Sequence, residues 1–264
     1  MVSSNLNPSK SLMRMGFDLV YPPRCPLCHL ALQESGGNCT LHSEICAVCA
    51  IRIAPNIPHS CPKCAAPVGP YSETLEKCNH CRSDRFQFNS IIRLGVYQDD
   101  LRSACLLAKQ KFGHSLMGAL GELLWQQEQR AFSETPVDVV VPIPMHWIKR
   151  ISGRHHATNS LGHVLARSLQ VDLGSHILSK VRRTPSQSSL SPSKRRKNLR
   201  KVFRVNRFSE LSGANILLVD DVLTTGTTAN EAAKMLLQAG AKRVTVAVIA
   251  RGLGQKVATN PIEI

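Results

Sequence analysis

Two adjacent carboxylates and a group of hydroxyls occur in one short stretch of the carboxyl-terminal half. Asp220 and Asp221 follow the apolar run 215–219, and threonines with one glycine occupy positions 224–228, just before a predicted helix. Free amides and the positive end of the helix dipole suit a phosphate at such a turn, and neighbouring carboxylates accept hydrogen bonds from vicinal hydroxyls. The pattern therefore favours a site for a phosphate beside a diol, as in ribose 5-phosphate.

Three other interpretations of this stretch compete with the sugar-phosphate site. A Walker B element is disfavoured because no G-x-x-x-x-G-K-[ST] sequence occurs in the chain. A magnesium site of another phosphotransfer protein would also use two carboxylates. Helix capping alone would explain one threonine or one aspartate, but not the whole run from 216 to 228.

Eight of the ten cysteines form four Cys-x-x-Cys pairs before residue 82. Two intervening residues let both sulfurs reach one ion at about 2.3 Å, so the pairs predict two closed Cys₄ zinc sites, with about two structural ions and no open position for water. In chain order the first site takes Cys25, Cys28, Cys46 and Cys49, and the second takes Cys61, Cys64, Cys78 and Cys81. An interleaved cross-brace, a redox or disulfide set, and replacement of one ligand by Cys39 or His42 stay open as alternatives.

The remaining pattern is typical of an α/β fold that would hold these groups in place. Apolar runs predict buried strands, and segments with helical spacing fall between them. The expected strands are 91–97, 137–142, 215–219 and 243–250, and the expected helices are several between 101 and 130, 158–169 and 228–239. Strand, helix and strand in this order predict a right-handed βαβ unit in a parallel sheet. Gly240 is expected to end the last helix with a positive φ.

Composition limits the class of protein and points to its partners. No apolar run approaches the roughly 18 residues that a bilayer-spanning helix needs, and the first 24 residues do not resemble a signal peptide. We therefore expect a cytoplasmic protein without membrane insertion. The 33 Lys and Arg against 18 Asp and Glu favour anionic partners, and eleven of these cations lie between Lys180 and Arg207 without one acidic residue.

The chain divides by composition into three parts. Residues 1–20 form an amino-terminal segment, residues 21–85 form a cysteine-rich module, and residues 86–264 form the α/β domain. Within this domain we expect hood or linker helices at 86–130 and a basic flexible loop at 180–207. A core too small to fold alone is typical of metal-stabilised modules, which agrees with the Cys- and Pro-rich composition of 21–85.

These residues resemble a known family. The run from Val219 to Thr228 is similar to the phosphoribosyl-diphosphate (PRPP) motif of type I phosphoribosyltransferases. From Pro22 to Arg251 the chain resembles the ComF family of competence-associated proteins, in which a zinc module precedes a phosphoribosyltransferase-like domain. Further similar stretches are Tyr21-Pro-Pro-Arg-Cys-Pro-Leu-Cys28, Lys111-Phe112-Gly113, Val141-Pro-Ile-Pro-Met-His146 and the segment from Thr184 to Arg200.

The resemblance implies a type I phosphoribosyltransferase-like parallel sheet flanked by helices, with a small amino-terminal double zinc ribbon. It assigns the ribose hydroxyls to Asp220 and Asp221, as catalytic residues, and places Mg²⁺ with the bound PRPP. The PRPP contacts that it implies are Thr224, Thr225, Gly226, Thr227 and Thr228, then Met145 and His146 in a pyrophosphate loop, and Arg196 in a basic loop that closes over the site. Segment 86–130 would be the acceptor-selecting hood, with no readable chemistry.

Two functions follow from this combination. One is transfer of phosphoribosyl from PRPP to an unknown nitrogen acceptor, in association with DNA uptake. The other is a non-catalytic protein in which PRPP regulates binding to single-stranded DNA or to the uptake machinery. The family usually carries Arg-Gly-aromatic-Asn where this chain has Arg154-His-His-Ala-Thr-Asn159, so turnover is a separate question from PRPP binding. The sequence leaves the oligomeric state open, with a homodimer among the options.

Overall fold

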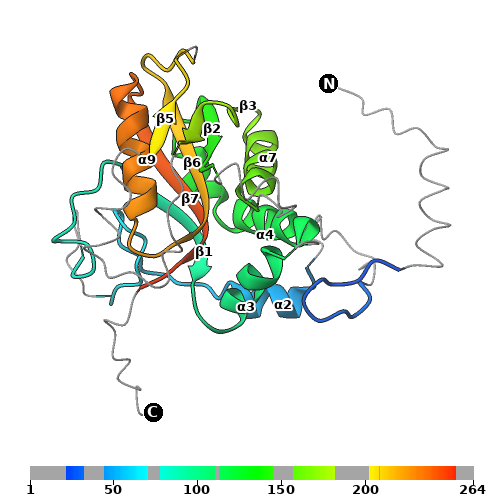
Figure 1. Cartoon of the computed structure of the whole chain (residues 1–264). Coiled ribbons are helices and arrows are strands. Elements are labelled where there is room, and N and C mark those ends of the chain that lie inside the picture. Colours follow the sequence, from blue (N-terminus) through cyan, green and yellow to red (C-terminus); the bar gives the residue numbers. More distant parts are fainter. Residues whose placement is uncertain are drawn as a thin grey trace, which may run out of the picture.

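A five-stranded parallel sheet forms the centre of the computed structural model, which describes residues 22–32, 45–70, 78–110, 113–144, 157–181, 202–207 and 209–253. The strands are, in spatial order, β1 (Ile91–Val96), β7 (Arg243–Arg251), β6 (Asn215–Leu223), β2 (Val139–Pro142) and β3 (Asp172–Leu173) (Figure 1). Every neighbouring pair is parallel. The expected α/β fold with a parallel sheet is therefore confirmed.

Helices cover both faces of the sheet. One face packs against α3 (Asp99–Ala108), α4 (His114–Gln127) and α7 (Ala157–Leu169), and the other packs against α9 (Thr227–Gln238). Figure 1 shows α9 on the opposite side of the strands from α4 and α7. A short helix, α5 (Gln129–Ser133), follows α4.

Strand β6 shows why its apolar run is continuous rather than alternating. Leu217 and Val219 point into the core under α4 and α7, whereas Ile216 and Leu218 point into the core under α9. Strands of a parallel sheet that is covered on both faces need apolar side chains at every position.

The connections that follow β2 and β6 lead toward opposite edges of the sheet. The β2–α7–β3 unit continues toward one edge, and the β6–α9–β7 unit continues toward the other. The two crossover helices consequently lie on opposite faces. In open α/β sheets, ligands bind at the carboxyl ends of the strands where the direction of the connections reverses, which here is the gap between β2 and β6.

Gly240 ends α9 as expected from the sequence. Its φ of 105° is one that residues with a Cβ rarely adopt. The Gly240 amide donates to the Leu237 carbonyl and the Ala241 amide to the Leu236 carbonyl, both at 3.1 Å, which is the Schellman pattern. This turn leads directly into β7.

β2 begins at Val139 rather than at 137, and β1 ends at Val96 rather than at 97. Two further differences from the sequence expectations are larger. β6 extends four residues beyond Val219, because it stays paired with β7 up to Leu223 and Arg251. In addition, the ends of the basic segment 180–207 are ordered: β4 (Leu178–Lys180) and β5 (Phe203–Val205) form an antiparallel pair.

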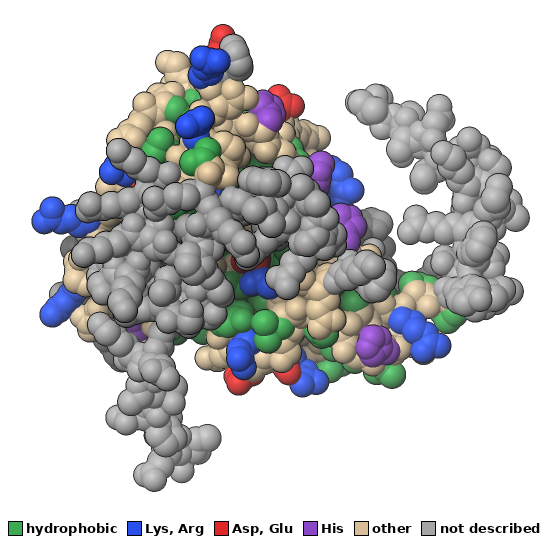
Figure 2. Space-filling view, viewed as in Figure 1, with side chains coloured by type: hydrophobic (Ala, Val, Ile, Leu, Met, Phe, Trp, Pro, Cys, Tyr) green, Lys and Arg blue, Asp and Glu red, His purple; other side chains and the backbone are tan. Residues whose placement is uncertain are grey.

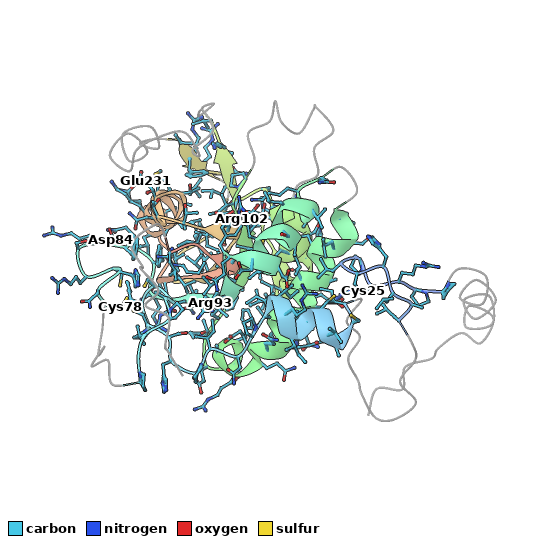
Figure 3. The ribbon with its side chains drawn as sticks, turned by 90° about the horizontal axis from the view of Figure 1, so that it is seen from below. Cys25, Cys78, Asp84, Arg93, Arg102 and Glu231 are labelled. Atoms are coloured by element: carbon cyan, nitrogen blue, oxygen red, sulfur yellow. The ribbon has the colours of Figure 1, made fainter. Side chains whose placement is uncertain are left out.

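The cysteine-rich part packs on the sheet domain at two places. Cys25 and Cys49 belong to the core under α3 and α4, while Cys61, Cys64 and Cys81 belong to the core under α9. Figure 3 shows Cys25 and Cys78 on opposite sides of the molecule, with Arg93 between them. None of the helices in the described ranges combines the length and apolarity that a bilayer crossing requires.

Candidate functional site

The acidic pair lies at the gap where the two crossovers diverge. β2 ends at Pro142, which pairs with Val219, so Asp220 and Asp221 extend past the end of β2 while β7 still supports them on the other side. Both residues are half-buried. The Asp221 amide donates to the Asp220 carboxylate at 2.9 Å, and the Val222 amide donates to the Asp221 carboxylate at 2.6 Å. Two carboxylates thus lie beside the end of β2, at the carboxyl edge of the sheet.

The electrostatics of the pair are unfavourable for two free negative charges. Burial raises the pKa of Asp220 well above its ordinary value, and the neighbouring Asp221 charge raises it further. The Asp221 amide and the Lys109 ammonium act in the opposite direction but do not compensate. A ligand that brings a cation or hydroxyl donors to this place would relieve the repulsion.

Lys109 supplies a counter-charge that the sequence did not reveal. Its Nζ lies 2.9 Å from a carboxylate oxygen of Asp221, and its side chain is 41% exposed. Burial lowers the pKa of Lys109, but Asp221 and Asp220 raise it more, and the net direction is upward. Lys109 follows α3 directly, so segment 86–130 does contribute a charged group to the site. A single lysine after the apolar face of a predicted helix was the only available signal.

Buried Cys105 lies one turn before Lys109 on α3. It is 0% exposed, as expected for a small residue on the apolar face of this helix. Burial and the Asp221 charge raise the pKa of its thiol to about 12, so Cys105 is a neutral thiol at ordinary pH. It is not part of either cysteine cluster.

The threonine-rich loop forms a tight turn between β6 and α9. Gly226 precedes the helix with a φ of 72°, and it offers no side-chain acceptor to the first-turn amides. The Thr225 and Thr227 hydroxyls lie 2.8 Å apart, and Thr224 is exposed. Thr227 and Thr228 form the first turn of α9. Hydroxyls and the first amides of α9 therefore follow the acidic pair directly in the chain, at a helix start that suits a phosphate.

Ile143 follows β2 directly, and its amide donates to the Val219 carbonyl of β6 at 2.8 Å. The buried Thr158 hydroxyl at the start of α7 donates to the Ile143 carbonyl at 3.0 Å and so holds this residue in place. Met145, His146 and Arg196, the other predicted PRPP contacts, lie outside the described residues, as does the stretch 154–156.

The eight paired cysteines form two separate clusters in sequential order. Within each cluster the four sulfurs lie within 4.8 Å of one another; the clusters are Cys25, Cys28, Cys46 and Cys49, and Cys61, Cys64, Cys78 and Cys81. The interleaved arrangement is thereby excluded for these residues.

Sulfur spacings in both clusters fit a tetrahedral zinc ion. Cys28 and Cys46 sulfurs lie 3.7 Å apart, and in the second cluster the distances run from 3.6 to 4.0 Å. A tetrahedron with zinc–sulfur bonds of about 2.3 Å has edges of about 3.8 Å. Four thiolates complete the coordination of such an ion, so both clusters fit structural zinc of the ribbon type and leave no position for a reacting water.

The pKa values of the thiols differ within each cluster. Burial raises the pKa of Cys25, but amides of Cys46, Cys28 and Leu27 outweigh it and lower the pKa to about 6. Burial likewise opposes the backbone donors at Cys61, whose pKa is lowered to about 7. The pKa values of Cys49 and Cys64 are raised, first by burial. Such backbone donors are typical of zinc-binding turns.

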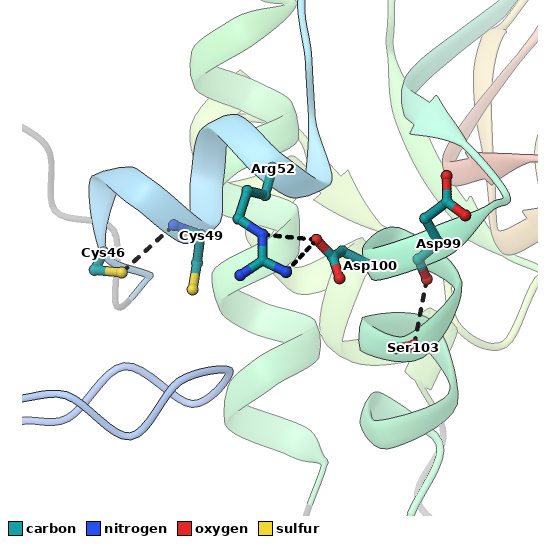
Figure 4. Close-up of polar contacts among 6 residues, drawn as sticks. All are labelled: Cys46, Cys49, Arg52, Asp99, Asp100 and Ser103. Atoms are coloured by element: carbon teal, nitrogen blue, oxygen red, sulfur yellow. Dashed lines mark hydrogen bonds and ion pairs between the residues drawn. The ribbon is translucent and has the colours of Figure 1, made fainter.

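The first cluster is attached to α3. Cys46 caps α2 (Ala47–Ile53), its sulfur accepting from the Cys49 amide at 3.5 Å. Farther along α2, Arg52 forms an ion pair with Asp100 at 2.8 Å (Figure 4). This pair is exposed and contributes on the order of 0.5 kcal/mol. Cys49 and Ile53 of α2 are also buried in the same core as the apolar face of α3.

Comparison with known proteins agrees with the geometry. Residues 160–260 match the phosphoribosyl transferase domain family. The DNA utilization protein YhgH of Salmonella typhi is 31% identical over 241 residues, which cover 89% of this chain and all of the relative. The chain belongs to the ComF family. Competence protein F of Haemophilus influenzae is 25% identical to this ComF-family chain, over 78% of the chain and 90% of the relative.

Among solved structures, a Bacillus subtilis glutamine PRPP amidotransferase in complex with ADP and GMP is 25% identical to this ComF-family protein, with a TM-score of 0.36. The match covers 52% of this chain and about a quarter of that enzyme (26%). On the basis of the family match at 160–260 and the strand order, the ComF-family protein combines a type I phosphoribosyltransferase-like sheet flanked by helices with two cysteine clusters that fit zinc ribbons.

Proposed function

We propose that this protein binds PRPP with Mg²⁺ in the gap between β2 and β6 and transfers the phosphoribosyl group to a nitrogen acceptor. The observation that carries the proposal is the position of Asp220 and Asp221 beyond the end of β2 and shortly before α9, whose N-cap is Gly226. No other part of the described chain places two carboxylates next to a helix start at the switch point of the sheet.

In this proposal the loop 224–228 holds the 5-phosphate through threonine hydroxyls and first-turn amides of α9. Asp220 and Asp221 accept hydrogen bonds from the ribose hydroxyls. Lys109 balances the charge of the pair before ligand arrives, and the ribose hydroxyls compete with it for Asp221. Carboxylate oxygens are the ligands that Mg²⁺ prefers, and the bound ion would neutralise part of the diphosphate charge. The chain orients the substrate and stabilises a leaving group, so no side-chain nucleophile is required.

Calorimetric titration with PRPP and Mg²⁺ tests the site. Wild-type protein should bind in a saturable, Mg²⁺-dependent manner, and Asp220→Asn with Asp221→Asn should bind at least about tenfold more weakly, because two charge-assisted hydrogen bonds are lost. Equal affinity in the variant would refute the assignment. An acceptor screen with pyrophosphate release as readout then separates transfer from binding without turnover.

A second candidate function, binding of single-stranded DNA, is favoured by charge and by the relatives. Curated relatives are named for DNA utilization and competence, and eleven cations lie between Lys180 and Arg207 without an acidic residue. On the face shown in Figure 2, Lys and Arg side chains of the described residues are scattered and form no single patch. In the sequence, the run of cations without an acidic residue is segment 180–207.

Salt dependence distinguishes this second function from PRPP binding. Each phosphate contact to a single strand contributes a slope of about −0.7 in a plot of log affinity against log salt. Fluorescence anisotropy with a labelled oligonucleotide should show such a steep dependence. Replacing Lys194, Arg195, Arg196 and Lys197 by Gln should flatten it. A slope unchanged by these replacements would place DNA contacts elsewhere.

A further inference from the structure

Arg251 connects the second cysteine cluster to the phosphate loop, defined here as residues 223–228. The residue ends β7 and is only 5% exposed. Its Nε donates to the Cys64 carbonyl at 3.0 Å, and its Nη1 donates to the Leu223 carbonyl at 3.1 Å and to the Thr224 carbonyl. A planar guanidinium with five donors in fixed directions holds several carbonyls at once. One buried side chain thus links a metal-binding turn to the loop before α9.

A second connection runs through the segment that follows the cluster. Phe86 packs so closely on Gly226 that a Cβ there would lie 2.9 Å from the ring. The Gln87 amide donates to the Asn230 side chain in the first turns of α9 at 2.6 Å. Phe86 follows Cys81 of the second cluster by only five residues, so a short segment connects the cluster to the loop.

The segment is also tied back to the first turn of the cluster. Lys63, between Cys61 and Cys64, donates to the Phe88 carbonyl and lies 5.8 Å from the centre of its ring. Phe88 is fully buried and stacks with Phe86 at 4.6 Å. Metal-binding turn, aromatic pair and phosphate loop therefore form one continuous packed unit.

The rest of the cysteine-rich part provides a contrast. Arg93 is as deeply buried as Arg251, and it also holds the second cluster region, through the Ala65 carbonyl and, at 2.8 Å, the Ser60 hydroxyl. These hydrogen bonds do not reach the phosphate loop. The first cluster lies under α3 on the other face of the sheet.

We propose that the second cysteine cluster is a metal-dependent clamp on the phosphate loop, and that Arg251 is the positioning residue that transmits metal occupancy to the loop. Without the ion, the four buried thiols have no common partner, and the Cys61–Cys64 turn loosens. The Cys64 carbonyl then no longer holds the Arg251 side chain in its position. Coupling free energies are reciprocal, so a loop ligand tightens zinc binding by the same factor by which zinc tightens ligand binding. This last consequence rests on the proposed PRPP site; the clamp itself does not.

Hydrogen–deuterium exchange of the full zinc-loaded chain, without PRPP, tests the clamp. Cys78→Ser, which disables the second cluster, should speed amide exchange in 223–228 by about tenfold or more, since this loop then opens locally. Cys28→Ser, the matched variant in the first cluster, should speed exchange in α2 and α3 and leave 223–228 unchanged. Unchanged loop exchange in Cys78→Ser, or equal loosening by both variants, would overturn the proposal.

Comparing Arg251→Gln with Arg93→Gln tests whether Arg251 transmits metal occupancy to the loop or only stabilises the fold. Zinc content, measured by metal analysis, should stay at the wild-type value in both. Arg251→Gln should speed amide exchange in the loop. Adding Cys78→Ser to it should cause little further change, because the hydrogen bonds that connect the cluster to the loop are already lost. With Arg93→Gln the Cys78→Ser effect should persist in full. Additive effects of Arg251→Gln and Cys78→Ser would overturn the role of Arg251.

If a cysteine variant does not fold, zinc removal by a chelator replaces it. Hydrogen exchange is then measured after partial zinc removal from the wild type and from Arg251→Gln, and the two proteins are compared in the same way. Failure of PRPP to bind the wild type, with the loop still loosened by zinc removal, would refute the proposed function and leave the clamp standing.

Discussion

Lys109 and Asp221 form an ion pair of 2.9 Å between the end of α3 and the acidic pair of β6. The contact joins the segment expected to select the acceptor to the residues expected to hold the ribose. It also places one cation against two adjacent carboxylates, of which Asp220 has a strongly raised pKa. The charge state of the site therefore depends on a residue about 110 positions away in the chain.

Lys109→Met should raise the pKa of Asp220 further, because Lys109 lowers that pKa in the wild type. Carboxyl ¹³C chemical shifts followed through a pH titration would report the change. Since the lysine is 41% exposed, the expected effect on stability is only about 0.5 kcal/mol. Lys109→Arg keeps the charge and should titrate like the wild type. Identical titrations of Lys109→Met and wild type would show that the pair does not sense this cation.

Asp220→Asn should stabilise the protein at neutral pH. A carboxyl whose folded pKa is raised contributes stability below its unfolded pKa and loses it as the pH rises through the folded pKa. The ionised group thus costs stability at neutral pH, and its removal should gain about 1 kcal/mol, or a Tm increase of about 2–4 °C.

The gain should disappear below about pH 4, where Asp220 is protonated in both states. Asp221→Asn, which also breaks the ion pair with Lys109, should gain less. Thermal unfolding at acidic and neutral pH measures both variants, and a gain independent of pH would contradict the burial of the charge.

Gly226→Ala should destabilise the protein and weaken phosphate binding. Its φ of 72° disfavours any residue with a Cβ, and the new carbon would meet the Phe86 ring at 2.9 Å. We expect a cost of about 2 kcal/mol in the free energy of unfolding, measured by urea denaturation. Gly118→Ala is the matched control: it lies inside α4 with no atom within 4 Å of the added carbon, and should gain up to about 1 kcal/mol. Similar losses at both sites would argue against the described loop conformation.

Zinc analysis should find about two ions per chain, as two Cys₄ clusters require. Cys64→Ser should reduce this to about one. Cys105→Ser should leave the content unchanged, because Cys105 lies apart from both clusters. In the native protein Cys105 should also resist alkylation, since its thiol has a pKa of about 12 and no exposed surface. Loss of zinc in Cys105→Ser would require a different ligand assignment.

The sequence alone determined the features that depend on local patterns. Continuous apolar runs identify strands buried on both faces, such as 243–250, because every position of those strands needs an apolar side chain. Cys-x-x-Cys spacing identifies the two cysteine clusters that fit zinc, since two intervening residues let a turn bring both sulfurs to one ion. Gly240 marks a helix end for a similarly local reason, its positive φ.

Only the tertiary structure decided the contacts between segments that are distant in the chain. Lys109 reaches Asp221 because α3 packs on the sheet, and Arg251 reaches Cys64 from the end of β7, beside the second cluster. In the sequence, a lysine or an arginine at the end of an apolar run looks the same whether its side chain is exposed to solvent or makes such a contact. The end of β2 before Asp220 and the placement of the two clusters under opposite faces likewise depend on packing of the whole chain, and no local pattern encodes them. The pairing of the cysteines was predicted in chain order, and the structure excludes the interleaved alternative.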